Sequence, residues 1–261
     1  MPRPLLEGFA EAWSRLAGGR WEGLALAGGW LVRWWAPDGR GEALPDRMYG
    51  VAEAVAAELD AEAFPPGCAV NLPPGVSAAG ARLHCITHRL STASVDQAWE
   101  SLRRVGRQGV HKARRTGCVV DHALEPSEWF ALSAAKSRAL GGRAPHPELV
   151  ATLLDVFGSD AVGLTGVRVG GQAAACVLWV LVEGYALLVD GASDRQVWDR
   201  NPNNLAVWEA VAAAIERGAR HVDYGFSPPG AGDARFKDHM GGRELPLYRL
   251  PARGLASTPP T

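Results

Sequence analysis

A short segment in the second half of the chain combines an acid, a tyrosine and a loop rich in glycine and proline. Residues 221–230 are His-Val-Asp-Tyr-Gly-Phe-Ser-Pro-Pro-Gly, and Lys237 follows them. On a strand, Asp223 faces one side of the sheet and Tyr224 the other. A strand that runs into such a loop is a common place for a site, because a rigid element presents a mobile rim. The alternative is structural: Asp223 would bind the amides of the loop.

The most charged stretch is Arg103-Arg-Val-Gly-Arg-Gln-Gly-Val-His-Lys-Ala-Arg-Arg115. Between Glu100 and Asp121 it holds six lysines and arginines and no acid. Such a stretch suits the binding of phosphates, by bidentate contacts and local positive potential. The alternative is a solvated helix whose arginines cover apolar surface. If helical, it has two adjacent basic faces, formed by Arg103, Arg107 and Arg114 and by Arg104, His111 and Arg115.

Several common catalytic and metal motifs are missing from the sequence. It has no GxSxG, GxxxxGK[ST], HExxH or GxGxxG motif. His84-Cys85-x-x-His88 has the right residue types for a metal, but neighbouring strand residues point to opposite faces, so we expect ordinary packing and no metal site. The four cysteines form no CxxC pair and no disulfide framework, so we expect reduced thiols.

Composition limits the function classes. The 261 residues are 47% hydrophobic and 21% charged, with a net charge of −1. This length suits one large domain or two small ones. The balanced charge excludes the sequence-wide basic field of a bulk nucleic-acid binder. No signal peptide and no apolar run of membrane-spanning length is evident, so we expect a cytoplasmic protein.

Hydrophobic periodicity predicts a mixed α/β chain. One Gly-Gly pair and one Glu-Gly pair separate three successive strands at hairpin spacing, which predicts an antiparallel meander. The helices expected are residues 5–16, 48–59, 94–115, 126–140, 147–157, 203–217 and 233–239. The strands expected are residues 24–26, 30–35, 69–72, 82–90, 118–121, 161–169, 172–182, 185–191, 221–224 and 244–250.

Four motifs occur in order between residues 99 and 250. They are Val110-His-Lys-Ala-Arg-Arg-Thr-Gly-Cys-Val-Val, Asp190-Gly-Ala-Ser, Asn201-Pro-Asn-Asn-Leu-Ala-Val-Trp-Glu-Ala, and Gly218-Ala-Arg-His-Val-Asp-Tyr-Gly running on to Phe236-Lys-Asp-His-Met-Gly. In order and spacing they resemble the acyltransferase domain of the Fem (FemABX) peptidyltransferases and their BioF2-like relatives, a branch of the GNAT superfamily. The resemblance implies a GNAT-like acyltransferase fold, with a mixed central sheet flanked by helices. It further implies a degenerate GNAT-like half at residues 1–98, the acyltransferase domain at 99–251 and a flexible tail at 252–261.

The resemblance implies an enzyme that transfers an acyl group to an amine. In Fem proteins the donor is an aminoacyl-tRNA ester and the acceptor is an amino group of a peptidoglycan precursor. For this chain it implies aminoacyl-tRNA as donor, an amine of a cell-envelope precursor or small molecule as acceptor, and no tightly bound cofactor. Because the donor is already activated, positioning and oxyanion stabilisation can supply most of the rate.

The resemblance also suggests site residues. Lys237 matches the family's Phe-Lys position near the acceptor and the scissile carbonyl, which implies electrostatic stabilisation. Asp223 would orient the amine or accept a proton through water. The substrate-binding residues expected are Arg107, Lys112, Arg114 and Arg115 for phosphates, and Tyr185, Asn204, Trp208 and Tyr224 for the cleft.

Two other functions remain open. An acyl-CoA-dependent GNAT enzyme binds pyrophosphate through [RQ]-x-x-G-x-[GA] at a strand-to-helix turn, where backbone amides face the phosphates. Two segments match: residues 168–173, in an expected hairpin, and residues 47–52, which open the helix expected at 48–59. Neither lies at a strand-to-helix turn of the second half. The other alternative is a non-catalytic GNAT-like module that binds a glycan or nucleotide precursor.

Overall fold

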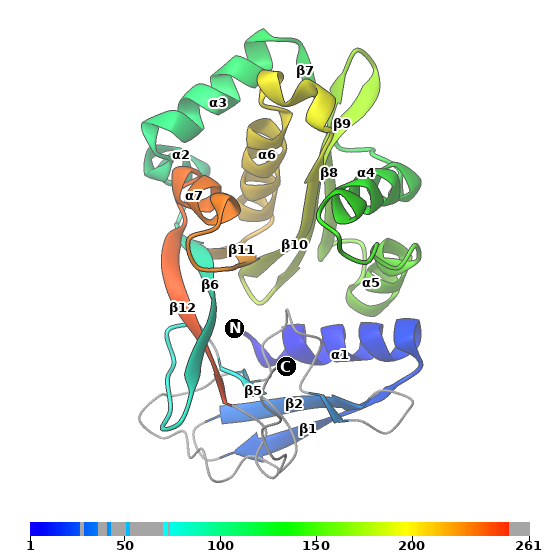
Figure 1. Ribbon diagram of the computed structural model, residues 1–261, viewed down its shortest axis with the longest axis vertical. Coiled ribbons are helices and arrows are strands. Elements are labelled where there is room, and N and C mark those ends of the chain that lie inside the picture. The colour runs from blue at the N-terminus through cyan, green and yellow to red at the C-terminus, as the bar shows by residue number, and fades with distance from the viewer. Residues whose placement is uncertain (27–28, 36–40, 43–50, 53–69, 73, 251–261) are drawn as a thin grey trace. The chain divides into compact units, whose positions relative to one another are not determined.

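The computed structural model describes residues 1–26, 29–35, 41–42, 51–52, 70–72 and 74–250 (Figure 1). The chain divides into two compact units, residues 1–86 with 245–261 and residues 87–244. Two strands, β6 (Arg82–Ser91) and β12 (Arg243–Leu250), contribute residues to both. The expected boundary at residue 98 stays a prediction, and the expected tail at 252–261 lies outside the described residues.

The first unit begins with a helix over a hairpin. Helix α1 (Arg3–Ala17) ends at Gly18, whose φ of 74° suits glycine. Strands β1 (Arg20–Leu26) and β2 (Gly29–Trp35) pair antiparallel along their whole length. These elements confirm the expected helix and the two expected strands, and the structure adds their pairing as a hairpin. A small core of the unit forms from Leu31, Val70, Leu72, Val76 and Leu250, beside β5 (Val70–Asn71).

The helix expected at residues 48–59 is wrong where the structure describes it. Val51 and Ala52 form β4 (Val51–Ala52), which pairs antiparallel with Leu31 and Trp30 of β2. Backbone pairing along the open side of β2 overrides the helical preference of this alanine-rich segment. The rest of the segment lies outside the described residues. A further short strand, β3 (Gly41–Glu42), also pairs with β2.

The second unit is built on a mixed sheet. Its strands follow the order β6-β11-β10-β9-β8-β7, and β12 lies on the far side of β6. The expected meander is confirmed: the turns at Gly170-Gly171 and at Glu183-Gly184 have positive φ angles and join antiparallel strands. Its members are β8 (Val162–Val169), β9 (Gln172–Val182) and β10 (Tyr185–Ser193). The outer strand is β7 (Cys118–Asp121), and β11 (His221–Ser227) lies parallel to β10.

Helices cover both faces of this sheet (Figure 1). On one face lies α6 (Pro202–Glu216), which buries Leu205, Trp208, Val211 and Ile215 at helical spacing. On the other lie α4 (Pro126–Ala139) and α5 (Leu149–Phe157). The expected α/β class is therefore confirmed.

The basic helix expected at residues 94–115 is interrupted. Ser94 caps α2 (Val95–Ser101) by accepting the amide of Gln97, and α3 (Arg104–Arg115) follows. Leu102 and Arg103 between them are extended. Two more helices complete the unit: α7 (Gly232–His239), which was expected, and the 3₁₀ helix η2 (Arg195–Arg200), which was not.

Candidate active site

The parallel strands β10 and β11 pair only at their beginnings. Their register runs from Tyr185 opposite His221 to Leu187 opposite Asp223. Beyond this point β10 has an irregularity after Leu188 and continues along β9. At Gly225 of β11, φ is 72° and a Cβ would lie 3.1 Å from the carbonyl oxygen of Leu188. This position therefore requires glycine.

Asp223 is fully buried, and three donors hold its carboxylate. The Thr87 hydroxyl and the Tyr185 phenol each donate over 2.5 Å, and the Gly225 amide donates over 2.8 Å. Burial raises the pKa of the Tyr185 phenol well above its usual range, and the negative charge of Asp223 is the second cause. The phenol therefore keeps its proton and remains a donor. Because Asp223 accepts the amide hydrogen of Gly225, it also has the structural role that the sequence left open as the alternative, the binding of a loop amide.

Lys237 lies on α7 and reaches back to the end of β11. Its ammonium group donates to the carbonyl oxygens of Gly225 (2.9 Å) and Phe226 (2.8 Å) and to the Ser227 hydroxyl (2.9 Å). The Ser227 hydroxyl in turn donates to Asp233 over 2.7 Å. The lysine side chain is only 13% exposed. Its charge therefore sits beside the backbone at the end of β11.

The two residues predicted to be catalytic meet at one glycine. Asp223 accepts the amide hydrogen of Gly225, while Lys237 and Thr87 both donate to its carbonyl oxygen. Together with Tyr185, they form one connected network around the end of β11. The network fixes the backbone of β11 where it leaves β10.

Two predicted cleft residues, Tyr224 and Trp208, lie in the core of the second unit, and a third, Asn204, is half-buried. Tyr224 is buried, its hydroxyl donates to the carbonyl oxygen of Met240 over 2.8 Å, and burial raises its pKa. Trp208 is buried and packs edge-on against Trp99. Asn204 donates to the sulfur of Met240. Their contact with a substrate stays a prediction.

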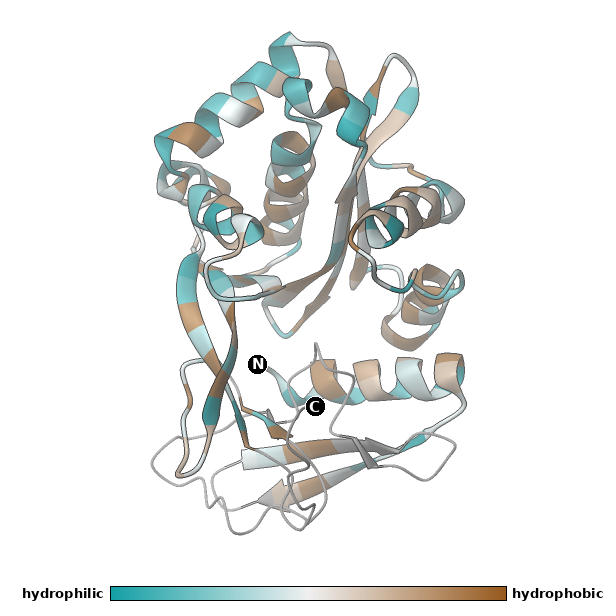
Figure 2. Ribbon diagram, in the orientation of Figure 1, coloured by the Kyte–Doolittle hydropathy of each residue, from teal (hydrophilic) through white to brown (hydrophobic). Residues whose placement is uncertain are grey.

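Small residues let α3 approach its neighbours closely. A Cβ on Gly106 would lie 2.2 Å from the carbonyl oxygen of His239, and one on Gly109 would lie 2.5 Å from the amide nitrogen of Asn204. The buried face of α3 consists of Gly106, Gly109, Val110 and Ala113. All its cations are therefore left on the outer side, which is mostly hydrophilic in Figure 2.

The cations predicted to bind phosphates differ in how they are held. Arg107 donates to the carbonyl oxygens of Glu100 and Leu102 at the end of α2, and so caps that helix. Arg114 pairs with Glu209 over 2.8 Å. Lys112 and Arg115 are exposed. The side chains of these two have no hydrogen-bond or ion-pair partner among the described residues.

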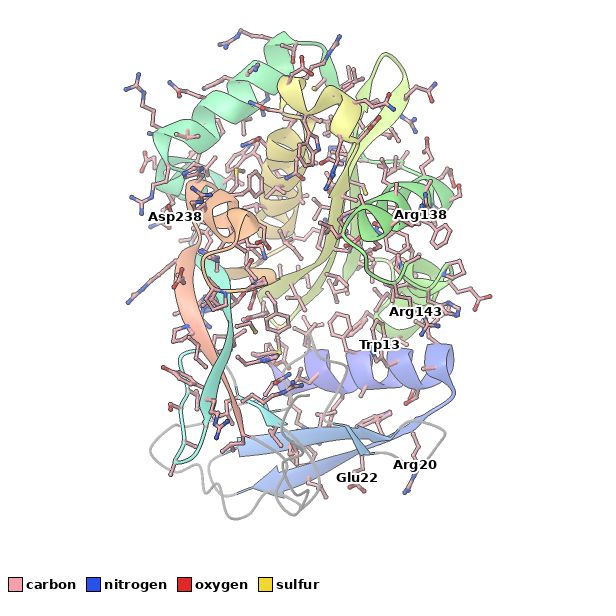
Figure 3. All side chains as sticks on the ribbon, viewed as in Figure 1. Trp13, Arg20, Glu22, Arg138, Arg143 and Asp238 are labelled. Atoms are coloured by element: carbon pink, nitrogen blue, oxygen red, sulfur yellow. The ribbon has the colours of Figure 1, made fainter. Side chains whose placement is uncertain are left out.

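A polar pocket lies beside the first turn of α3. Its volume is about 690 Å³. The α2–α3 turn and the α7–β12 turn form its walls, and Arg103 pairs there with Asp238, which Figure 3 labels on α7. Its lining residues are Glu100, Ser101, Leu102, Arg103, Arg104, Arg107, Asp238, Gly241, Gly242, Arg243 and Glu244.

One polar cluster was missed by the sequence analysis. The Asp190 carboxylate of β10 accepts hydrogen bonds from Ser133 and Lys136 of α4, and Lys136 also donates to the carbonyl oxygen of Gly191 over 2.9 Å. The cluster connects α4 to the part of β10 that no longer pairs with β11. Asp190 opens the Asp-Gly-Ala-Ser motif, and Lys136 is one of only three lysines, so both had a sequence signal.

No group of three or more His, Cys, Asp or Glu side chains within the described residues could hold a metal ion. Within the same residues, no helix has both the length and the hydropathy needed to cross a membrane.

Comparison with solved structures shows the fold. A crystal structure of FemX matches with 13% identity and a TM-score of 0.66, over 93% of this chain and 90% of that one. The structure of L-PGS from Bacillus licheniformis matches with 11% identity and a TM-score of 0.52, over 97% of this chain and 92% of that one. A GCN5-related N-acetyltransferase from Kribbella flavida matches with 14% identity and a TM-score of 0.50, over 96% of each chain. No curated protein sequence matches the chain.

A family model provides the classification. The model of the acetyltransferase (GNAT) domain matches residues 96–238, which cover nearly all of the segment from α2 to α7 and, of the network around Gly225, Tyr185, Asp223 and Lys237 but not Thr87. This range is more than half of the chain. The chain belongs to the acetyltransferase (GNAT) domain family.

Proposed function

We propose that this acyltransferase moves an aminoacyl group from aminoacyl-tRNA to an amine of a cell-envelope precursor or small molecule. In this reaction a neutral amine attacks the ester carbonyl, an oxyanion develops, and the ribose hydroxyl leaves. The exposed cations of α3 would bind phosphates of the donor. The structural likeness to FemX, at 13% identity, supports the proposal through the fold alone.

The connection between β10 and α6 is the observation that favours this donor over acyl-CoA. A CoA-dependent member places a glycine-containing cradle of backbone amides at such a strand-to-helix turn. Here η2 occupies the turn, residues 194–204 contain no glycine, and Pro202 in the first turn of α6 has no amide hydrogen to offer. The turn therefore lacks the flexible cradle.

The two segments that match the CoA motif lie in the wrong structural context. Arg168 precedes the β8–β9 hairpin turn, where it pairs with Asp121 and Glu128. The other match ends in Val51 and Ala52, which lie on β4. Neither segment opens a helix within the described residues.

Within this proposal, Lys237 and Asp223 act at the end of β11. The positive charge of Lys237 would stabilise the oxyanion, since charge in a site sheltered from water acts more strongly than in bulk solvent. Asp223 would keep Tyr185 and the amide of Gly225 in position. The lysine would lower the barrier, and the aspartate would hold the geometry.

The test compares two donors directly. Purified protein is incubated with an amine acceptor, such as a lysine-containing stem peptide, and with either radiolabelled aminoacyl-tRNA or radiolabelled acetyl-CoA. Transfer from the tRNA alone is the expected result, and transfer from acetyl-CoA alone would overturn the proposal. Thermal unfolding with CoA gives a check without an acceptor, because a ligand at about 100 times its Kd adds about 2.7 kcal/mol of stability.

The family match favours acyl-CoA as the second candidate donor, because the model that matches is that of an acetyltransferase domain. A thermal shift with CoA, and transfer of the acetyl group, would establish it. A protein that binds a precursor but transfers from neither donor would be the non-catalytic module.

A further inference from the structure

One tryptophan of the second unit is exposed in the connection between β10 and α6. Trp198 of η2 exposes 51% of its surface, whereas Trp129, Trp179 and Trp208 are buried. Its indole N–H donates to the Ser193 hydroxyl over 2.9 Å, which fixes the orientation of the ring. Burial stabilises most tryptophans, and the exposed Trp198 lacks much of that stabilisation although its ring is held in one orientation.

One cation is placed against this ring, and another ends the same helix. The Arg195 guanidinium lies 5.3 Å from the ring centroid. Arg200 ends η2 and donates to the carbonyl oxygen of Thr116 over 3.1 Å, while the Thr116 hydroxyl donates to the carbonyl oxygen of Arg200. These bonds join η2 to the end of α3, and Figure 1 shows the two segments next to each other at the top of the unit.

We define the α3–η2 surface as Lys112, Arg115, Arg195, Trp198 and Arg200. All five side chains are exposed. Asp199 is the exposed acid within η2, and Asp194 is occupied in capping it, since its carboxylate accepts the amide hydrogen of Gln196. The surface therefore keeps a positive charge beside a single aromatic face.

A held aromatic ring among cations is the chemistry that binds a single-stranded nucleic acid. The ring stacks on a base, and the cations neutralise the phosphates on either side. We propose that the α3–η2 surface binds single-stranded RNA, with Trp198 stacking on a base and Lys112, Arg115 and Arg195 contacting phosphates. The inference rests on the proposed function, because the acceptor end of a donor tRNA is single-stranded.

An anionic membrane is the other partner that tryptophan and cations can attract. A membrane also requires contiguous apolar area. The other exposed large apolar side chains described in this unit lie singly on separate elements: Val105 on α3, Val119 on β7, Leu154 on α5 and Leu140 after α4. Within η2 the other residues are charged or polar except Val197, which is partly buried. The surface therefore favours RNA.

The test measures the binding of a fluorescein-labelled single-stranded 12-nucleotide RNA, of the same RNA as a duplex, and of vesicles of phosphatidylglycerol and phosphatidylcholine. W198A is expected to weaken single-strand binding by about 10-fold, and W198F to restore most of it. The double variant K112Q/R115Q is expected to reduce the slope of log K against log salt by about 1.4. R138Q is the matched control, because Arg138 is exposed on α4, away from α3 (Figure 3).

Three results would overturn the inference: unchanged single-strand affinity in W198A, an equal loss in R138Q, or Trp198-dependent binding of vesicles without binding of RNA. The outcomes also separate this inference from the proposed function. If W198A loses RNA binding while the wild type transfers nothing from aminoacyl-tRNA, the surface stands and the function fails. If W198A transfers from aminoacyl-tRNA with unchanged KM, the function stands and the surface fails.

Discussion

Replacement of Lys237 by methionine tests the network at the end of β11. Methionine keeps most of the apolar stem and removes the ammonium group with its three hydrogen bonds. After the change, Gly225 retains the Thr87 hydroxyl and Ser227 retains Asp233, whereas the carbonyl oxygen of Phe226 loses the donor it has from Lys237. All three oxygens therefore lose a charged donor.

The magnitude follows from these contacts. A hydrogen bond to a charged group contributes about 1.5–3 kcal/mol. Removing a cation that is only 13% exposed relieves part of its desolvation, which offsets some of the loss. We therefore expect Lys237→Met to lower the free energy of unfolding by roughly 2–3 kcal/mol.

The assay is urea denaturation at pH 7, followed by initial rates of transfer under conditions in which the variant is folded. Lys112→Met is the matched control, since Lys112 is exposed on α3, and its stability should change by less than about 0.5 kcal/mol. Lys237→Met is also expected to lose transfer, with kcat affected more than KM. A change in stability as small as that of the control would refute the structural argument, and full activity would remove the catalytic assignment.

Three further predictions follow from burial and packing. Burial lowers the pKa of His88, and the charge of Lys237 is the second cause, so the unfolded chain takes up the proton first as pH falls below about 6.5. The free energy of unfolding should then drop by up to about 1.4 kcal/mol per pH unit, and by less in His88→Gln. The measurement compares urea midpoints at pH 7.5 and pH 5.5. Gly106→Ala should lower the free energy of unfolding by about 1–3 kcal/mol in thermal unfolding, because the new Cβ would lie 2.2 Å from a backbone oxygen. In the control Gly142→Ala the nearest atom is 3.6 Å away, and an equal loss of stability there would contradict the packing argument. Burial raises the pKa of the Cys176 thiol to about 12, so native protein at pH 8 should not be alkylated there by iodoacetamide, and modification located by mass spectrometry would disprove its burial.

Elements with a clear local signal were predictable. The meander from β8 to β10 has hairpin glycines and strand-like runs, and the structure has it nearly residue for residue. The periodic apolar positions of α6 mark its buried face in the same way. Such elements are specified by neighbours in the sequence, which is why the sequence suffices.

Elements that depend on distant partners were not predictable. Strand β4 forms because Val51 and Ala52 pair with β2, although their own composition favours a helix. The break between α2 and α3 places the amide of Arg103 on the carbonyl oxygen of His239, far along the chain. Local propensity contains no information on either contact.

Part of the candidate site could be predicted from the sequence, and part of it could not. The strand-and-loop pattern was enough to single out Asp223 and Lys237, and the resemblance to Fem proteins suggested their roles. Thr87, which donates to Asp223, lies 136 residues away in the sequence on β6. No spacing rule connects them, because the pairing depends on the order of strands in the sheet.

The scarcity of free amines on this protein has a chemical consequence. An enzyme that handles activated esters and amines risks acylating its own lysines. The chain has three lysines: Lys237 is mostly buried and bound to oxygens, Lys136 is held by Asp190, and Lys112 is exposed. Under the proposed function, accidental acylation from a bound donor is therefore directed to Lys112, while the two lysines that tie helices to the sheet are protected by their own hydrogen bonds.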